Sequence, residues 1–387
     1  MSRTIAVVTG GRADYGLLFW PMREIAADPA LALALIVTGS HLEPGYGMTV
    51  ERIEADGFEI AHRVPIALDD DSPSGIARSM GLCLAGMVEA FAVASPDIVM
   101  LLGDRYEIFA AAQAAMLLNL PIAHIAGGDI TEGAIDDVIR HAITKMAHLH
   151  FATNEEAGRR IVQMGEAPER VHVTGSPGLD HLVRETPMAR AELEASLGHE
   201  LRARNILMTF HPVTLEPDGG LAQLDALLAA LDGLGPEVAI WITRPNADGG
   251  GQAIAARIDA WAAGRPNVFI YTSLGQARYL GLLAAADVIV GNSSSGYYEA
   301  PSFGTPTVDV GNRQQGRLRG PSIFQCDGQA EAIGAAIGRA MAFDRRQAVN
   351  PYGDGRSAER IVALLKQAPP RPELLRKRFH PAGSDRP

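Results

Sequence analysis

The chain has 387 residues, of which 47% are hydrophobic and 20% charged, and its formal net charge at pH 7 is -11. This is the composition of a folded globular protein, and the length favours two domains. The acidic balance argues against nucleic acid or an anionic membrane as a partner, since both favour a basic surface. An anionic small molecule remains compatible with it, because local arginines can bind one.

The two cysteines, Cys83 and Cys326, lie far apart and in no metal-type spacing, which favours a reducing compartment. The apolar run at 4–9 is too short for a signal sequence and leads straight into a glycine turn. We find no apolar stretch of the roughly 18 residues that a membrane span needs. We therefore expect a cytoplasmic protein with no membrane partner.

Short apolar runs alternate with longer amphipathic stretches, the pattern of βαβ units and a parallel sheet. The first half predicts strands at 4–9, 31–37, 58–64, 98–102, 121–125, 149–153 and 171–174. It predicts helices near 16–27, 46–56, 74–94, 106–118, 135–148 and 154–164. After a turn-rich, polar stretch at 175–205, strands are expected near 205–210, 237–243, 267–271, 287–290 and 306–310. The helices of this second series are expected near 219–233, 251–263, 276–285, 296–302 and 328–343.

The pattern thus predicts an α/β protein with two Rossmann-like domains facing a cleft. We place the first domain at 1–185 and the second at 186–355. A terminal helix at 356–368 is expected to pack back on the first domain. The proline-rich segment 369–387 is expected to be a disordered tail.

Polar loops follow many of the predicted strands, at the sheet edge where open α/β sheets bind ligands. Glycines there let the backbone approach a ligand, although such turns also occur for connection alone. The candidate binding residues in these loops are Arg12, Asp14, His41, Arg105, Arg244 and Arg313.

The stretch from Leu101 to Phe151 concentrates acids, an arginine and an imidazole around two strand ends. Asp104 and Asp136 are the acid–base candidates, because an ionised carboxylate can take a proton from a substrate. The alternatives are an ion pair for Asp104 and a charge favouring the helix dipole for Asp136. The same stretch adds further candidates for proton transfer, namely His124, Asp129 and Glu132.

The loop Gly291–Gly296 is the candidate diphosphate site, with Asn292, Ser293 and Ser294 at its tip. It is neither a P-loop nor a nucleophile elbow, and 10–16 lacks the nicotinamide fingerprint. Glu299 could accept hydrogen bonds from a ribose, or be a solvated surface charge. His211 could reach a phosphate or a sugar, or merely orient the turn before a proline.

A metal site needs three or four converging ligands with recognisable spacing. The four histidines of the central stretch, at 124, 141, 148 and 150, do not show it. We expect neither a metal nor another cofactor.

Taken together, several motifs resemble the hydrolysing UDP-N-acetylglucosamine 2-epimerases of sialic-acid and legionaminic-acid synthesis, over about residues 3–365. They are Gly10–Gly16, Gly103-Asp104-Arg105, His124 to Phe151, Thr209-Phe210-His211-Pro212 and Gly291-Asn292-Ser293-Ser294. The resemblance implies a GT-B-like fold and elimination of UDP followed by hydration of the glycal. It implies catalytic roles for Asp104, Asp136 and His211. It also implies nucleotide-binding roles, for Arg12, Arg105, Ser293, Ser294, Glu299 and Arg313.

The chain departs from the family pattern at Ala126, where many members carry a glutamate. It also has one residue more in the following loop, Thr131-Glu132-Gly133. This form is more similar to members acting on UDP-N,N'-diacetylbacillosamine. We therefore expect a UDP-activated amino sugar as substrate and a homodimer or homotetramer. The alternatives are a glycosyltransferase of the same fold and a non-catalytic nucleotide-sugar sensor.

Overall fold

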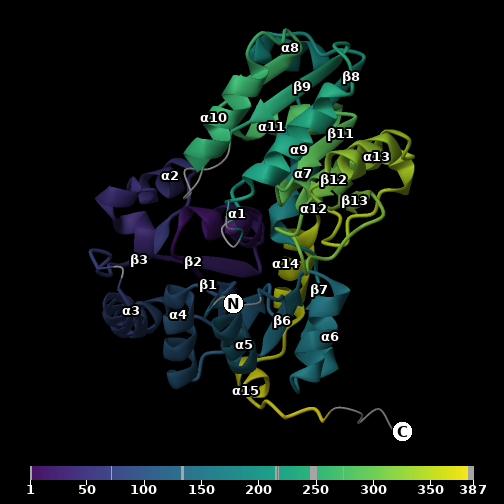
Figure 1. The fold of residues 1–387 in the computed structure, drawn as a ribbon. Coiled ribbons are helices and arrows are strands. Elements are labelled where there is room, and N and C mark those ends of the chain that lie inside the picture. Colours follow the sequence, from purple (N-terminus) through teal and green to yellow (C-terminus); the bar gives the residue numbers. More distant parts are fainter. Residues whose placement is uncertain are drawn as a thin grey trace, which may run out of the picture. The chain divides into compact units, whose positions relative to one another are not determined.

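The computed structural model describes residues 2–70, 72–131, 135–213, 216, 218–244, 251–272 and 274–381. The chain forms two compact units (Figure 1). Unit 1 comprises residues 1–183 and 352–387, and unit 2 comprises 184–351. The predicted boundaries after 185 and 355 lie within four residues of these.

Unit 1 is built on a seven-stranded parallel sheet with the order β3-β2-β1-β4-β5-β6-β7. Its strands are β1 Arg3–Thr9, β2 Leu31–Thr38, β3 Ile60–Val64, β4 Ile98–Leu102, β5 Ile122–Ile125, β6 Leu149–Ala152 and β7 Val171–Val173. Its helices are α1 Arg12–Ala27, α2 Val50–Ala55, α3 Pro73–Ala94, α4 Tyr106–Leu117, α5 Ile135–Met146, α6 Glu155–Gln163 and α7 Asp180–Arg184, followed late in the chain by α14 Ser357–Gln367 and α15 Arg371–Leu374.

Both faces of this sheet are covered, which explains why its central strands are apolar throughout. In β1, Ile5 and Val7 pack on the face covered by α1 and α14. Ala6 and Val8 pack on the opposite face, with α3 and α4. Alternate side chains along this strand therefore pack into two separate cores, one on each face of the sheet.

The chain returns to unit 1 after residue 351, and the yellow α14 and α15 lie among its elements (Figure 1). Ile361 and Leu365 of α14 are fully buried in the same core as α1. The terminal helix thus packs on the first domain as predicted. The chain remains structured beyond it: Leu374 of α15 is buried, and His380 N–H donates to the carbonyl of Gly165. Ordered contacts therefore continue well past the point where a disordered tail was expected.

Unit 2 holds a six-stranded parallel sheet with the order β10-β9-β8-β11-β12-β13. Its strands are β8 Arg204–Thr209, β9 Val238–Thr243, β10 Val268–Tyr271, β11 Val288–Gly291, β12 Thr307–Val310 and β13 Ile323–Cys326. Its helices are α8 Arg190–Leu197, α9 Leu221–Asp232, α10 Gly251–Ala262, α11 Gly275–Ala285, α12 Ser295–Tyr298 and α13 Ala330–Met341. Two Rossmann-like units confirm the predicted α/β fold class.

The structure differs from the predicted elements at several places. Strand β13 and helices α7, α8 and α15 were not predicted, and the helix expected at 296–302 is a four-residue α12 followed by a 3-10 turn at Ala300–Phe303. Helix α3 is long and apolar enough to cross a membrane by length and composition alone. The expectation that the chain has no apolar stretch of this length is therefore wrong. Met87 and Phe91 on one side of this helix pack into the core of unit 1.

Candidate functional site

Each sheet has a position where the strand order reverses, and the loops after the two strands there border a ligand crevice. In unit 1 these strands are β1 and β4, followed by Gly10-Gly11-Arg12 and Gly103-Asp104-Arg105. In unit 2 they are β8 and β11, followed by Phe210-His211 and Asn292-Ser293-Ser294. The polar motifs of the sequence therefore lie at the two positions where this architecture binds ligands.

At the end of β1, Asp14 and His41 hold the backbone of the loop. Asp14 accepts hydrogen bonds from the Thr9 hydroxyl and the Gly10 N–H, both at 2.8 Å. His41 is fully buried, with its ring nitrogens 3.0 Å from the Thr9 hydroxyl and 2.7 Å from that of Thr49. Burial lowers the pKa of His41, so it is a neutral anchor at pH 7. Both predicted binding residues thus shape the loop from beneath.

Arg12, in contrast, is exposed at the start of α1 and has no ion-pair partner among the described residues. Arg105 is half-exposed and pairs with Glu107, whose side chain is fully buried. Burial raises the pKa of Glu107, and Arg105 opposes that rise. A Cβ on Gly10 would collide with the Glu107 side chain, so this acid also requires glycine there. The two arginines can meet an anionic ligand, with Arg105 held in place by Glu107.

The loop after β4 places Asp104 against Arg140 of α5. The Arg140 guanidinium is buried and donates to the Asp104 carboxylate, to the Thr131 hydroxyl at 2.9 Å and to the Asp129 carbonyl at 2.9 Å. Burial raises the pKa of Asp104, the Arg140 charge opposes the rise, and the Asp136 charge adds to it. Arg140 therefore orients the carboxylate and favours its ionised form.

Asp136, in the first turn of α5, is partly buried and lies near enough to Asp104 to affect its titration. The structure thus brings together the two carboxylates predicted for proton transfer. Glu132, a third predicted acid, lies outside the described residues.

His124 and Asp129 are both enclosed by protein contacts. His124 is fully buried, its Nε2 lies 2.8 Å from the Gly103 carbonyl and its Nδ1 3.3 Å from the Thr144 hydroxyl. Burial lowers its pKa to about 3. Asp129 accepts from the Thr153 hydroxyl at 2.9 Å and from the Asn154 amide at 3.3 Å, and burial raises its pKa. These contacts suit residues that hold the loop around Asp104.

In unit 2, Asn292 fastens the ends of β8 and β11 to each other. Its side chain is fully buried, accepts from the His211 N–H at 2.7 Å and donates to the His211 carbonyl at 2.9 Å. The Asn292 carbonyl accepts from Gln314 at 2.8 Å and from Arg313 at 3.1 Å. Asn292 therefore positions His211 and Arg313.

The serine loop leaves two donors for a ligand. Within the described chain, the backbone N–H groups of Ser293 and Ser294 donate to no protein acceptor. The Ser295 hydroxyl, in contrast, is 2.7 Å from the Tyr279 hydroxyl. Because α12 has only four residues, these local donors matter more here than a helix dipole.

Glu299 directly follows α12. One of its carboxylate oxygens is sealed from solvent and has no partner among the described residues. Burial raises the pKa of Glu299 to about 7. A buried acceptor without a donor is costly, so a ligand hydroxyl would satisfy it.

Arg244, a predicted binding residue, is held by contacts within the protein. Its guanidinium pairs with Asp259 at 2.6 Å, and its backbone N–H donates to the Tyr271 carbonyl at 3.0 Å. Among the described residues no group of three or more His, Cys, Asp or Glu side chains is arranged to hold a metal ion.

Three buried polar residues of the site were not singled out by sequence reasoning, namely Glu107, Arg140 and Gln314. Arg140 lies within the His124 to Phe151 motif of the resemblance, which could have drawn attention to it. For Glu107 and Gln314 the sequence offers no comparable signal, because their partners are set by the tertiary fold.

Comparisons with known proteins identify the family. The family model described as UDP-N-acetylglucosamine 2-epimerase matches residues 23–366. The UDP-N,N'-diacetylbacillosamine 2-epimerase (hydrolyzing) of Legionella pneumophila is 37% identical over 97% of this chain and 99% of its own length. The GDP/UDP-N,N'-diacetylbacillosamine 2-epimerase (hydrolyzing) of Campylobacter jejuni is 36% identical over 84% of each chain.

Solved structures show the same fold. The UDP-GlcNAc 2-epimerase from Neisseria meningitidis bound to UDP-GlcNAc superposes with a TM-score of 0.79, covering 94% of this chain and 100% of that one. Its sequence identity in that superposition is 18%, so this similarity concerns the fold alone.

Proposed function

Because the chain belongs to the UDP-N-acetylglucosamine 2-epimerase family, we propose that it is a hydrolysing UDP-N-acetylhexosamine 2-epimerase. Its products would be UDP and the free 2-epimerised sugar. The observation that carries the proposal is the Asp104–Arg140 pair beside Asp136, at the strand-order reversal of unit 1.

The proposal assigns the nucleotide to unit 2. The free N–H groups of Ser293 and Ser294 would donate hydrogen bonds to the diphosphate, and the unpartnered Glu299 oxygen would accept one from a ribose hydroxyl. Arg313, held by Asn292, would face the same diphosphate. Donors fixed before the reaction stabilise the charge that develops as UDP departs.

The sugar is assigned to the carboxylates of unit 1. One carboxylate removes the proton from C2, the C2–H electron pair forms the C1–C2 double bond, and the C1–O bond to UDP breaks. Water then adds its oxygen to C1 of the glycal, and C2 takes a proton on its other face. Asp104, ionised and oriented by Arg140, suits the base, and Asp136 suits the second transfer.

We further propose UDP-N,N'-diacetylbacillosamine as the preferred substrate. Two relatives at 36–37% identity carry that activity in their names. Ala126, where many family members have a glutamate, lies directly after β5 with its N–H donating to the Phe151 carbonyl at 3.1 Å. A methyl group there cannot transfer a proton, and in the proposed complex the C4 acetamido group would take the room that a glutamate side chain would fill.

The test is a proton NMR time course in deuterated water with UDP-GlcNAc and UDP-N,N'-diacetylbacillosamine in parallel. The proposal expects deuterium at C2 of a liberated sugar, with faster release from the diacetylated substrate. Acceptor-dependent UDP release without exchange at C2 would instead identify a glycosyltransferase, and binding without turnover a sensor. Release from UDP-GlcNAc alone would refute the substrate preference.

Asp104→Asn and Asp136→Asn test the residue assignment. Each is expected to abolish turnover while UDP affinity, measured by calorimetry, changes little, since neither carboxylate is assigned to the nucleotide. Near-normal turnover in both variants would remove the acid–base assignment.

A further inference from the structure

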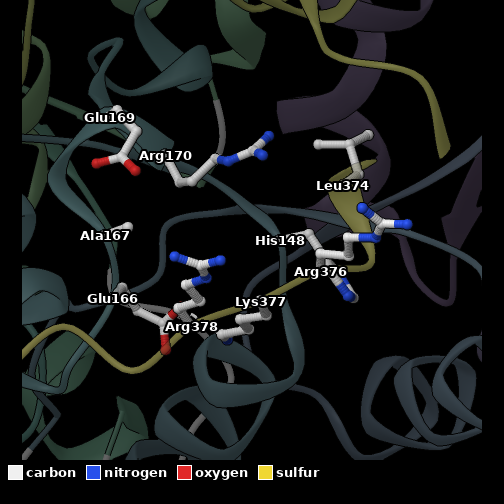
Figure 2. Close-up of a pocket in the computed structure, with 9 residues that line it drawn as sticks. All are labelled: His148, Glu166, Ala167, Glu169, Arg170, Leu374, Arg376, Lys377 and Arg378. Carbon is white, nitrogen blue, oxygen red and sulfur yellow. Dashed lines mark ion pairs between the residues drawn. The ribbon is translucent and has the colours of Figure 1, made fainter. Parts of the chain in front are cut away.

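A small pocket in unit 1 lies where the C-terminal segment covers the region after α6. It has a volume of about 100 Å³ and is lined by His148, residues 166–170 in part, and residues 374–378 in part. Figure 2 shows the side chains of Arg170, Arg376 and Arg378 around it, contributed by two distant parts of the chain.

The lining carries an excess of positive charge although the whole chain has a net charge of -11. Four cationic side chains, Arg170, Arg376, Lys377 and Arg378, meet two carboxylates, Glu166 and Glu169. The excess of two positive charges is concentrated at one place, where it can attract an anion.

Lys377 is already fully used by the protein. Its ammonium group donates to Glu166 at 2.7 Å and to the carbonyls of Lys145 and Ala147 at 2.6 and 2.8 Å. Burial alone would raise the pKa of Glu166, but its bonds to His150, Lys145 and Lys377 hold it at about 2. The buried Glu166 carboxylate thus holds the C-terminal segment through Lys377. Its charge is balanced by Lys145 and Lys377 and does not pair with the three arginines.

The arginines, by contrast, have no such partners. Within the described part of the chain, the guanidinium groups of Arg170, Arg376 and Arg378 form no ion pair or hydrogen bond. His148 offers a further donor: its Nδ1 accepts from the Ile122 N–H at 3.1 Å, so the neutral ring carries its proton on Nε2. Burial and the Lys377 charge lower the pKa of His148 to about 4, which keeps the ring neutral at pH 7.

We propose that this pocket binds a small phosphate-class anion, which links Arg170 to the C-terminal segment at Arg376 and Arg378. Donors from three parts of the chain suit a tetrahedral group with several acceptor oxygens better than a planar carboxylate. The volume is well below the roughly 300–1,000 Å³ of drug-sized ligand pockets, so it accommodates a phosphate group rather than a whole nucleotide. Free inorganic phosphate and the terminal phosphate of an organic ester share this chemistry.

The primary test is calorimetric titration of the full chain with inorganic phosphate at constant ionic strength. Saturable binding is expected, at least about tenfold weaker in the Arg170→Ala/Arg378→Ala double variant. Arg159→Ala, which removes an exposed arginine of α6 that does not line the pocket, is the matched control and should bind as the wild type. Absence of saturable binding, or equal affinity in the double variant, would overturn the proposal.

Parallel titrations with glycerol 2-phosphate, sulfate and acetate identify the class. Tighter binding of phosphate assigns the site to the free ion, and tighter binding of glycerol 2-phosphate assigns it to an ester. Both results support the proposal. Acetate binding as well as phosphate would exclude a phosphate-class site.

Tryptic cleavage within Arg376–Arg378, followed by mass spectrometry, gives a second readout. At ten times the dissociation constant, phosphate should slow this cleavage about tenfold if it holds the segment closed. Arg170→Ala retains every cleavage site of the segment but should lose the protection. Equal protection in that variant would show that phosphate does not act through the pocket.

Discussion

Arg140→Gln is the change that most directly tests the assigned proton-transfer site. The variant leaves the Asp104 carboxylate without its cation, and the Thr131 hydroxyl and Asp129 carbonyl without their donor. Breaking a buried ion pair costs roughly 3–5 kcal/mol, but the Asp104 side chain is 21% exposed and water can partly replace the guanidinium. We therefore expect a loss of about 2–4 kcal/mol in the free energy of unfolding at neutral pH.

The pH dependence separates this explanation from a general loss of packing. Burial already raises the pKa of Asp104 and Arg140 opposes the rise, so its removal should raise that pKa further. The acidic limb of the kcat/KM profile should then move to higher pH, because the base must be ionised to act. The stability loss should shrink on acidification, since protonation of Asp104 removes the unpaired charge.

Arg140→Lys is the matched control, because lysine retains the charge but lacks the planar fork. It should keep the acidic limb close to its wild-type position while losing part of the stability. UDP release measured across the pH range and urea unfolding supply the two quantities. An acidic limb that stays in place in Arg140→Gln would refute the reasoning.

Three further predictions concern unit 2. Since the pKa of Glu299 is raised to about 7, UDP affinity should fall as the pH is lowered from about 8 to about 6. Glu299→Gln should weaken UDP binding about tenfold at pH 8 and should remove most of this pH dependence. A wild-type affinity that calorimetry finds to be independent of pH would contradict this prediction. Burial raises the pKa of Asp309 to about 6, so its ionisation destabilises the fold as pH rises through that value. Asp309→Asn should therefore be about 1–3 kcal/mol more stable than wild type at pH 8 in urea unfolding, with no gain near pH 4. Gly291 has φ +141°, and a Cβ there would strike the β8 backbone, so Gly291→Ala should lower the free energy of unfolding by at least about 3 kcal/mol. Gly338 lies on α13 with open space around it, so Gly338→Ala should raise the free energy of unfolding by about 0.5–1 kcal/mol. Similar thermal unfolding of the two variants would refute the argument.

Most strands could be predicted because a parallel sheet covered on both faces makes them apolar throughout. Strand β4, for example, has the predicted bounds 98–102. Strand β13 escaped detection because it lies at the sheet edge, is partly buried along its whole length and carries a glutamine. Helix α8 escaped because only Leu193 and Leu197 of its eight residues are buried, which gives too weak a periodicity.

The closeness of several candidate residues could be predicted from the sequence, but the protein contacts that each of them makes could not. Asp104 and Asp136 do lie close together, yet Arg140, the partner of Asp104, is one turn further along α5 and reaches it only when this helix packs against β5 and α4. Glu107 is similar: in the sequence it is an ordinary first-turn acid of α4, and its full burial follows from the closeness of Gly10. Sequence patterns report what a residue is, whereas these roles depend on which segment is brought against it.

The role of a side chain is hardest to predict from the sequence at the residues that follow a strand. Inside a strand, the alternation of side chains predicts which face each residue occupies, but the alternation ends with the strand. The next side chain can then turn inward to fasten the loop or outward to meet a ligand. Asn292 turns inward and fastens His211, while the following Ser293 and Ser294 keep their N–H groups free of protein acceptors. Anchors and free donors are therefore neighbours in the sequence, and the anchors hold the free donors in the fixed arrangement that the proposed recognition of a diphosphate requires.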